Sequence, residues 1–185
     1  MWRFSIVVLI TTLLVVACNL QPAVTVHDFS QLPVETAQDF SLILTWSTGS
    51  LPPQYTYIYV VKLGPGLQGV LEYRPGYDLH DISRQWVADF TVSEQQMNDL
   101  FEYLQSQDMF RSNWKKGEPM EGSPGTSLIL DVSGNEFHVP SISILDRTEL
   151  ARVDAAIEAI RTLVPQTIWD ELDARQKEYE ANFEE

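Results

Sequence analysis

The sequence has little of what catalysis, covalent cross-linking or nucleic-acid binding requires. It contains one cysteine, which makes an internal disulfide impossible, and three histidines, which leaves few candidates for imidazole chemistry. Basic residues are also scarce, because 12 lysines and arginines stand against 26 acidic residues and give a net charge of -14. A chain this acidic repels nucleic acid, so we expect no nucleic-acid partner. The motifs GxSxG, HEXXH and CXXC are absent.

A long uncharged apolar run is present at the N-terminus. Met1, Trp2 and Arg3 give a short positive start, and the run that follows from Phe4 to Val16 carries no charge. This pattern is typical of a removable export signal, and at about 13 residues the run is too short to span a bilayer as a helix. It ends in Val15-Val16-Ala17-Cys18, which is an aliphatic residue, a variable one, a small one and then cysteine.

This ending resembles the lipobox of bacterial lipoproteins. The resemblance implies that residues 1–17 are removed and that Cys18 receives a diacylglyceryl group, and in many bacteria an acyl chain on its amine. The mature chain would then carry a net charge of -15 and sit on the extracytoplasmic face of a bacterial membrane or outer envelope, because two or more acyl chains anchor a protein stably. The alternative is a buried strand or short anchor with an incidental cysteine.

The rest of the chain predicts a tether followed by one α+β domain. Residues 18–38 show no sustained periodicity and are interpreted as the tether. Alternating apolar residues predict strands over 40–46, 55–63 and 70–74, and a second hairpin over 128–132 and 136–139. Residues 77–88 allow no clear assignment. We therefore expect about five antiparallel strands, packed with two to three helices, over residues 39–165.

Capping signals predict where the helices begin. Ser93 stands three residues before Gln96, and an apolar stripe follows to about residue 107. Asp146 and Glu149 repeat that spacing before a longer helix that ends at Pro165. Residues 166–185 predict a C-terminal amphipathic helix with an acidic end.

The letters GxGxxG occur over 64–69, but their context does not suit a dinucleotide. Such a site needs the glycines between a strand and a helix N-terminus, whereas Val70 to Arg74 predicts a second strand. The glycines are interpreted as a hairpin loop, and no cofactor is expected. Asp78, His80 and Asp81 are the nearest approach to a metal cluster, although a solvated loop is the commoner reading of mixed polar residues. We therefore expect no metal site.

Tyrosines gather in the first hairpin and supply the candidate partner surface. Tyrosine with arginine on a sheet face is the composition of a recognition surface, since rigid rings bury area at little entropic cost. The candidates are Tyr55, Tyr57, Tyr59, Tyr73 and Arg74. The alternative, favoured because strands are rich in tyrosine, is that the rings cover a sheet face under a helix.

These patterns favour a non-enzymatic binding or assembly module, anchored in the membrane through lipid on Cys18 and holding a protein partner in the envelope. One alternative is an envelope enzyme that uses a metal or scattered carboxylates such as Asp78, Asp81 and Asp89. A second follows from the order of elements, which is similar to that of small proteinaceous inhibitors of secreted metalloproteases of the emfourin type over about two thirds of the chain. That likeness implies a protease inhibitor and carries over no residues.

Overall fold

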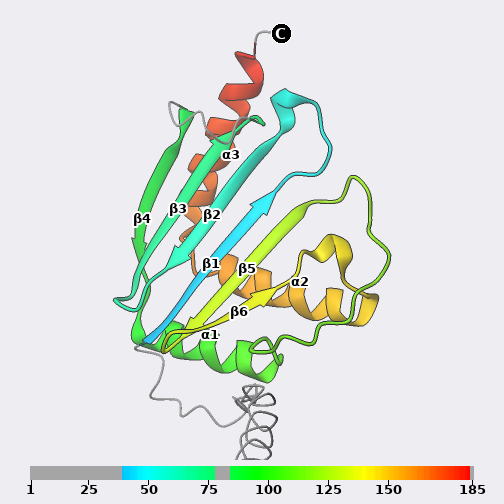
Figure 1. The fold of residues 1–185 in the computed structure, drawn as a ribbon. Coiled ribbons are helices and arrows are strands. Elements are labelled where there is room, and N and C mark those ends of the chain that lie inside the picture. Colours follow the sequence, from blue (N-terminus) through cyan, green and yellow to red (C-terminus); the bar gives the residue numbers. More distant parts are fainter. Residues whose placement is uncertain (1–38, 78–83, 184–185) are drawn as a thin grey trace, which may run out of the picture.

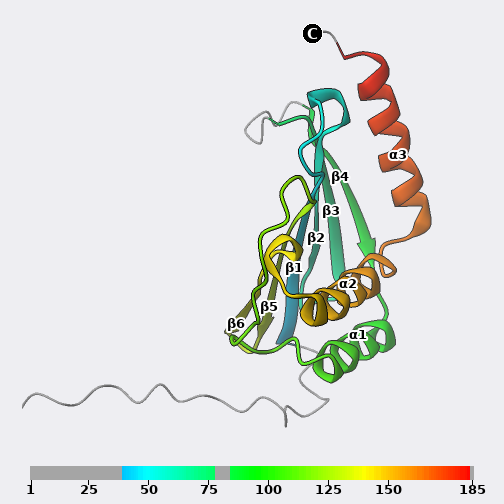
Figure 2. The same ribbon diagram turned by 90° about the vertical axis from the view of Figure 1, so that its right-hand side faces the viewer.

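A six-stranded antiparallel sheet forms the centre of the molecule, and three helices cover one of its faces (Figures 1 and 2). The computed structural model describes residues 39–77 and 84–183. The strand order is β4-β3-β2-β1-β5-β6. The strands are β1 (Phe40–Ser47), β2 (Tyr57–Leu63), β3 (Gln68–Pro75), β4 (Trp86–Thr91), β5 (Gly125–Val132) and β6 (Asn135–Val139). The helices are α1 (Glu94–Ser106), α2 (Arg147–Arg161) and α3 (Gln166–Ala181), with short 3-10 turns η3 (Pro53–Tyr55) and η5 (Ile142–Ile144). The predicted α+β class is confirmed.

Alternation along β1 decides which face of the sheet is buried. Phe40, Leu42 and Leu44 are 0–2% exposed, and they belong to one buried cluster with apolar residues of the three helices. β1 lies between β2 and β5, so Leu44 has Val61 on one side and Leu128 on the other. Each of these is also buried. The core is therefore one layer of aliphatic and aromatic side chains between sheet and helices.

Both predicted N-terminal caps are present, at α1 and at α2, but only the cap of α1 has hydrogen bonds in both directions between its two residues. The Ser93 hydroxyl accepts a hydrogen bond from the Gln96 backbone, and the Gln96 side chain accepts one from the Ser93 backbone. The Asp146 carboxylate accepts from the backbone N–H groups of Thr148 and Glu149. The Glu149 side chain does not complete the box, because it is buried against Arg111.

β4 begins in the segment that allowed no clear assignment from sequence. It raises the number of strands to six from the expected five or so. Its side chains alternate as the edge of a one-sided sheet requires, with Phe90 buried and Val87 49% exposed. The Phe90 ring fills the space above Gly69, where a Cβ atom would lie 2.3 Å from the ring. The unassigned segment also contains residues 78–83, which lie outside the described residues.

Helix α3 runs along the sheet on the side of β2 and β3 (Figures 1 and 2). Leu172 reaches the core, and Gln176 is buried against the sheet. The last turns of α3 lie at one end of the sheet, with the end of β3 and the beginning of β4. Phe40 begins β1 at the opposite end, near α1.

Candidate functional site

The five residues predicted as a partner surface do not share one surface. Tyr59 and Tyr73 are 3% and 2% exposed, because α3 packs on them through Trp169 and Gln176. Tyr57 is half-buried beside them, and Tyr55 is exposed on η3. Arg74 lies on the opposite sheet face, 3.0 Å from the Glu72 carboxylate. The alternative in which a helix covers the rings therefore holds for Tyr59 and Tyr73, and this part of the predicted surface is wrong.

The buried tyrosines belong to an aromatic cluster. Tyr59 stacks on Trp46 at 5.2 Å between ring centroids and meets Trp169 of α3 edge-on at 5.1 Å. Burial raises the pKa of the Tyr59 hydroxyl and of the Tyr73 hydroxyl, so both stay protonated at neutral pH. The Tyr59 hydroxyl is buried with no hydrogen-bond partner among the described residues. These rings act in packing.

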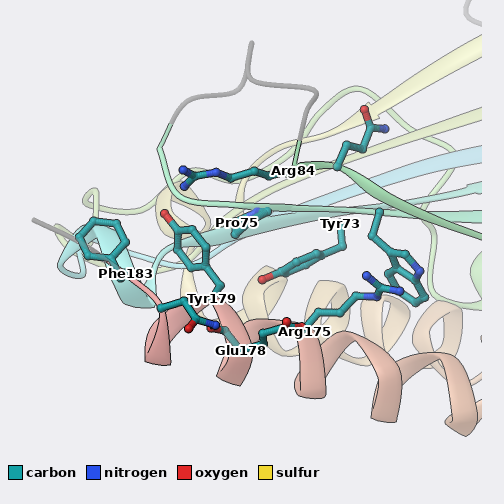
Figure 3. Close-up of a pocket in the computed structure, with 10 residues that line it drawn as sticks. Tyr73, Pro75, Arg84, Arg175, Glu178, Tyr179 and Phe183 are labelled. Atoms are coloured by element: carbon teal, nitrogen blue, oxygen red, sulfur yellow. The ribbon is translucent and has the colours of Figure 1, made fainter.

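A groove opens where α3 passes the end of β3 and the start of β4, and we call it the α3 groove (Figure 3). Its volume is ≈ 520 Å³. The lining residues are Tyr73, Pro75, Arg84, Gln85 and Trp86 from the sheet side, and Arg175, Glu178, Tyr179, Asn182 and Phe183 from the helix side. A pocket of this size accommodates a few side chains of a partner.

Two arginines lie on aromatic rings across the α3 groove. The Arg175 guanidinium of α3 sits 4.7 Å from the ring centroid of Trp86, and Arg84 sits 5.6 Å from that of Tyr179. Each wall thus supplies one cation and one ring to the other. When a guanidinium stacks on an aromatic ring, its flat face contacts the ring. Its N–H donors point outward in the guanidinium plane, where they can bind a carboxylate. Arg175 also pairs with the exposed Glu171, four residues earlier on α3, at 2.8 Å.

Backbone geometry next to the groove depends on Gly76. This residue has φ +80°, and its N–H donates to the Thr56 carbonyl at 2.7 Å. A Cβ atom at this position would lie 2.8 Å from the Tyr179 hydroxyl. Glycine is therefore required both for the turn and for the close approach of Tyr179 to the end of β3.

A second, smaller hollow of ≈ 380 Å³ lies where α2 meets α3. Arg161 covers the Trp169 ring at 5.1 Å, and the Trp169 indole N–H donates to the Arg161 carbonyl at 3.1 Å. Carboxylates of Glu158 and Asp173 line the same hollow. Because Arg161 belongs to α2 and Trp169 to α3, these contacts join the two helices, and Arg161 also pairs with Glu158 of its own helix at 3.2 Å.

The residues considered for chemistry are dispersed. Asp89 is exposed on β4, and His138 is exposed on β6, 2.6 Å from Glu136. Within residues 39–77 and 84–183, no group of three histidine, cysteine or acidic side chains could hold a metal ion. Cys18, Asp78, His80 and Asp81 lie outside the described residues. The 64–69 glycines lie in the β2–β3 hairpin, as the sequence predicted.

Comparison with known proteins adds no assignment. No protein family matches the chain, and no curated protein matches its sequence. In the described part of the chain, no helix has the length and apolar character needed to cross a bilayer.

Sequence reasoning missed the α3 groove because its parts are distant in the chain. Arg84 and Trp86 stand in the unassigned segment, whereas Arg175 stands in the predicted C-terminal helix. One local signal was available. Arg175 and Tyr179 lie one helical turn apart and three and seven residues after the buried Leu172, so all three share a face of α3.

Proposed function

We propose that this chain is a non-enzymatic binding module, held on the extracytoplasmic face of a bacterial membrane by lipid on Cys18, which binds a protein partner through the α3 groove. The lipobox resemblance supports the anchor. The groove supports the binding role, and the stacking of Arg175 on Trp86 and of Arg84 on Tyr179 is the observation that carries it.

The groove has the composition of an energetic centre in a protein interface. Tryptophan, tyrosine and arginine are the residue types that contribute most to binding when a partner covers them. Here all three converge from two elements in a concavity, rather than being scattered over the surface (Figure 3). The rings hold the guanidinium groups in place before a partner arrives, which lowers the entropic cost of binding.

The floor of the groove is rigid. The Tyr73 hydroxyl donates to the Gln176 side chain, and the Gln176 amide donates to the Gln54 carbonyl at 3.0 Å. These bonds fix the distance between α3 and β3, and with it the width of the groove. A site built on a strand and a helix holds its side chains more precisely than a site on loops.

Site-specific photo-cross-linking in the bacterium that makes the protein tests this proposal. A benzophenone amino acid is placed at Asn182, which lines the groove, or at the exposed Lys177 on the same helix as the matched control. We expect a discrete cross-linked product in the membrane fraction from position 182 alone, and its loss in the Arg175→Gln variant. With Cys18→Ser, the chain should keep its signal segment and carry no lipid. Identical products from both positions, or products unchanged by Arg175→Gln, would contradict the binding site.

A further inference from the structure

We infer that the partner segment held by the α3 groove is an extended peptide strand that pairs with the outer edge of β4 and places an acidic side chain in the groove. This inference rests on the proposed function, and it adds the partner's conformation and chemistry. It follows from the outer edge of β4, with which no described strand pairs, from the stacking of Arg175 of α3 on Trp86 of β4, and from the charge of the groove.

The hydrogen-bond pattern identifies which backbone groups of β4 point outward. The Val92 N–H donates to the Leu67 carbonyl at 3.0 Å, and the β3–β4 register continues this pairing two residues at a time. Hydrogen-bonded and non-hydrogen-bonded pairs alternate in an antiparallel ladder. The N–H and C=O groups of Val87, Asp89 and Thr91 therefore face away from β3, and no described strand pairs with them.

The outer edge of β4 is less protected against the addition of a strand than the outer edge of β6, at the other side of the sheet. β6 presents the exposed side chains of Glu136 and His138, and Pro140 follows it directly. Charge and proline are the usual means of blocking strand addition. On β4 the middle of the strand presents Val87, which is 49% exposed, and the single charge of Asp89. β4 is thus the edge that accepts another strand.

A strand added here would lie about 4.8 Å from β4, whose first residue, Trp86, lines the groove. Alternate side chains would point to the helix face, beside Trp86 and the Arg175 guanidinium that covers it. Those between would lie on the open face against Val87. An extended peptide bound between an edge strand and a helix is a recurring mode of recognition, in which backbone bonds give affinity and alternate side chains give specificity.

Charge favours an acidic side chain from a different protein over a second copy of this chain. The groove is lined by two arginines and one carboxylate, that of Glu178, so its lining is positive on balance, and a guanidinium binds a carboxylate through paired N–H donors. Antiparallel pairing of two β4 strands centred on Asp89 would set two carboxylates opposite each other, which is destabilising.

The test begins with peptides selected from a random twelve-residue display library against the full chain in detergent micelles. Affinity is then measured for matched variants. Asp89→Pro removes one outward N–H and leaves the β3–β4 bonds intact, whereas Asp89→Ala keeps that N–H. Arg175→Gln removes the groove cation, and Lys177→Gln removes an exposed cation from the same helix. Thermal denaturation checks that each variant is folded.

We expect selected peptides to contain an acidic residue, to bind about tenfold more weakly to Asp89→Pro and to Arg175→Gln, and to bind the two controls within about twofold. Hydrogen exchange at the amides of Val87, Asp89 and Thr91 should slow when peptide binds. If Arg175→Gln weakens binding and Asp89→Pro does not, the groove binds without strand addition, so the inference fails and the proposed function stands. If neither matters, both fail. Absence of any selected peptide, or a dimer that Asp89→Pro dissolves, would also overturn the inference.

Discussion

The Tyr73 hydroxyl donates a hydrogen bond to the side-chain oxygen of Gln176, which follows it by 103 residues. Both side chains are buried, and Gln176 also donates to the Gln54 carbonyl and to Glu180. This one glutamine therefore joins α3 to β3 and to the turn before β2. A buried polar network of this kind stabilises the fold only while each of its members is satisfied.

Two tyrosine variants compare how much a hydrogen-bonded hydroxyl and an unpaired hydroxyl contribute to the free energy of unfolding. Tyr73→Phe leaves the Gln176 oxygen buried without this donor, so we expect the free energy of unfolding to fall by about 1–3 kcal/mol. Tyr59→Phe removes a hydroxyl that has no partner among the described residues, so we expect stability to stay within about 0.5 kcal/mol or to rise. Urea denaturation of both variants provides the measurement. Equal losses would argue against the hydrogen-bond assignment.

Two glycines of the 64–69 run should differ sharply in tolerance. Gly69→Ala forces a methyl group into the Phe90 ring, so we expect a loss of about 1–3 kcal/mol in the free energy of unfolding. A Cβ atom at Gly66 meets nothing within 4 Å, so Gly66→Ala should change stability by less than about 0.5 kcal/mol. Thermal unfolding of the pair decides the question, and the reverse order would contradict the hairpin packing.

The buried carboxylate of Glu149 should matter far more than an exposed one on the same helix. Glu149 is 2% exposed and pairs with Arg111, whose guanidinium lies 4.2 Å from the Trp114 ring centroid. Glu149→Ala leaves that guanidinium without its buried partner, and we expect a loss of about 3–5 kcal/mol in the free energy of unfolding. Glu158→Ala breaks only an exposed pair with Arg161 and should cost less than about 0.5 kcal/mol. Chemical denaturation of both variants measures this. Equal losses of stability in Glu149→Ala and Glu158→Ala would contradict the importance of the Glu149–Arg111 pair.

The cap of α2 should make stability sensitive to acid. Hydrogen bonds from the Thr148 hydroxyl and from the backbone of Glu149 and Thr148 hold the pKa of Asp146 below its usual value of about 3.8. The carboxylate therefore stabilises the fold fully above that value, and this contribution is lost as the pH falls through the lower pKa of the folded state. Asp146→Asn keeps the capping oxygen but not the charge. We expect its Tm to lie below that of the wild type at pH 6, and the difference to narrow as the pH falls below about 3.8.

The lipid anchor gives a separate prediction. Thiol chemistry at the cysteine precedes signal cleavage in the lipoproteins that the N-terminus resembles, so Cys18→Ser should leave an uncleaved and unlipidated precursor. Mass spectrometry of the N-terminal peptide measures this directly. Normal acylation and cleavage in the variant would contradict the lipoprotein assignment and would leave the groove proposal untouched.

The features that could be predicted from the sequence are those that depend on residues close together in the chain. Alternation from Phe40 to Trp46 requires only that one face be buried, and the Ser93–Gln96 cap is closed within three residues. Which element covers the buried face of a hairpin depends instead on residues far away in the chain. Tyr59 and Tyr73 are buried because α3, about 100 residues later, packs on them, and no periodicity in the hairpin encodes that partner. Glu149 shows the same limit, because its side chain pairs with Arg111 and does not complete the expected cap of α2.

The direction in which β1 enters the sheet has a spatial consequence for a chain tethered by its N-terminus. Phe40 stands at one end of the sheet and the α3 groove at the other, so the eight residues of β1 place them about 25 Å apart. A lipid at Cys18, as proposed, would pull on the end of the sheet that is remote from the groove. The α3 groove would then lie at the end of the domain away from the attachment point of the tether, open to proteins of the aqueous compartment.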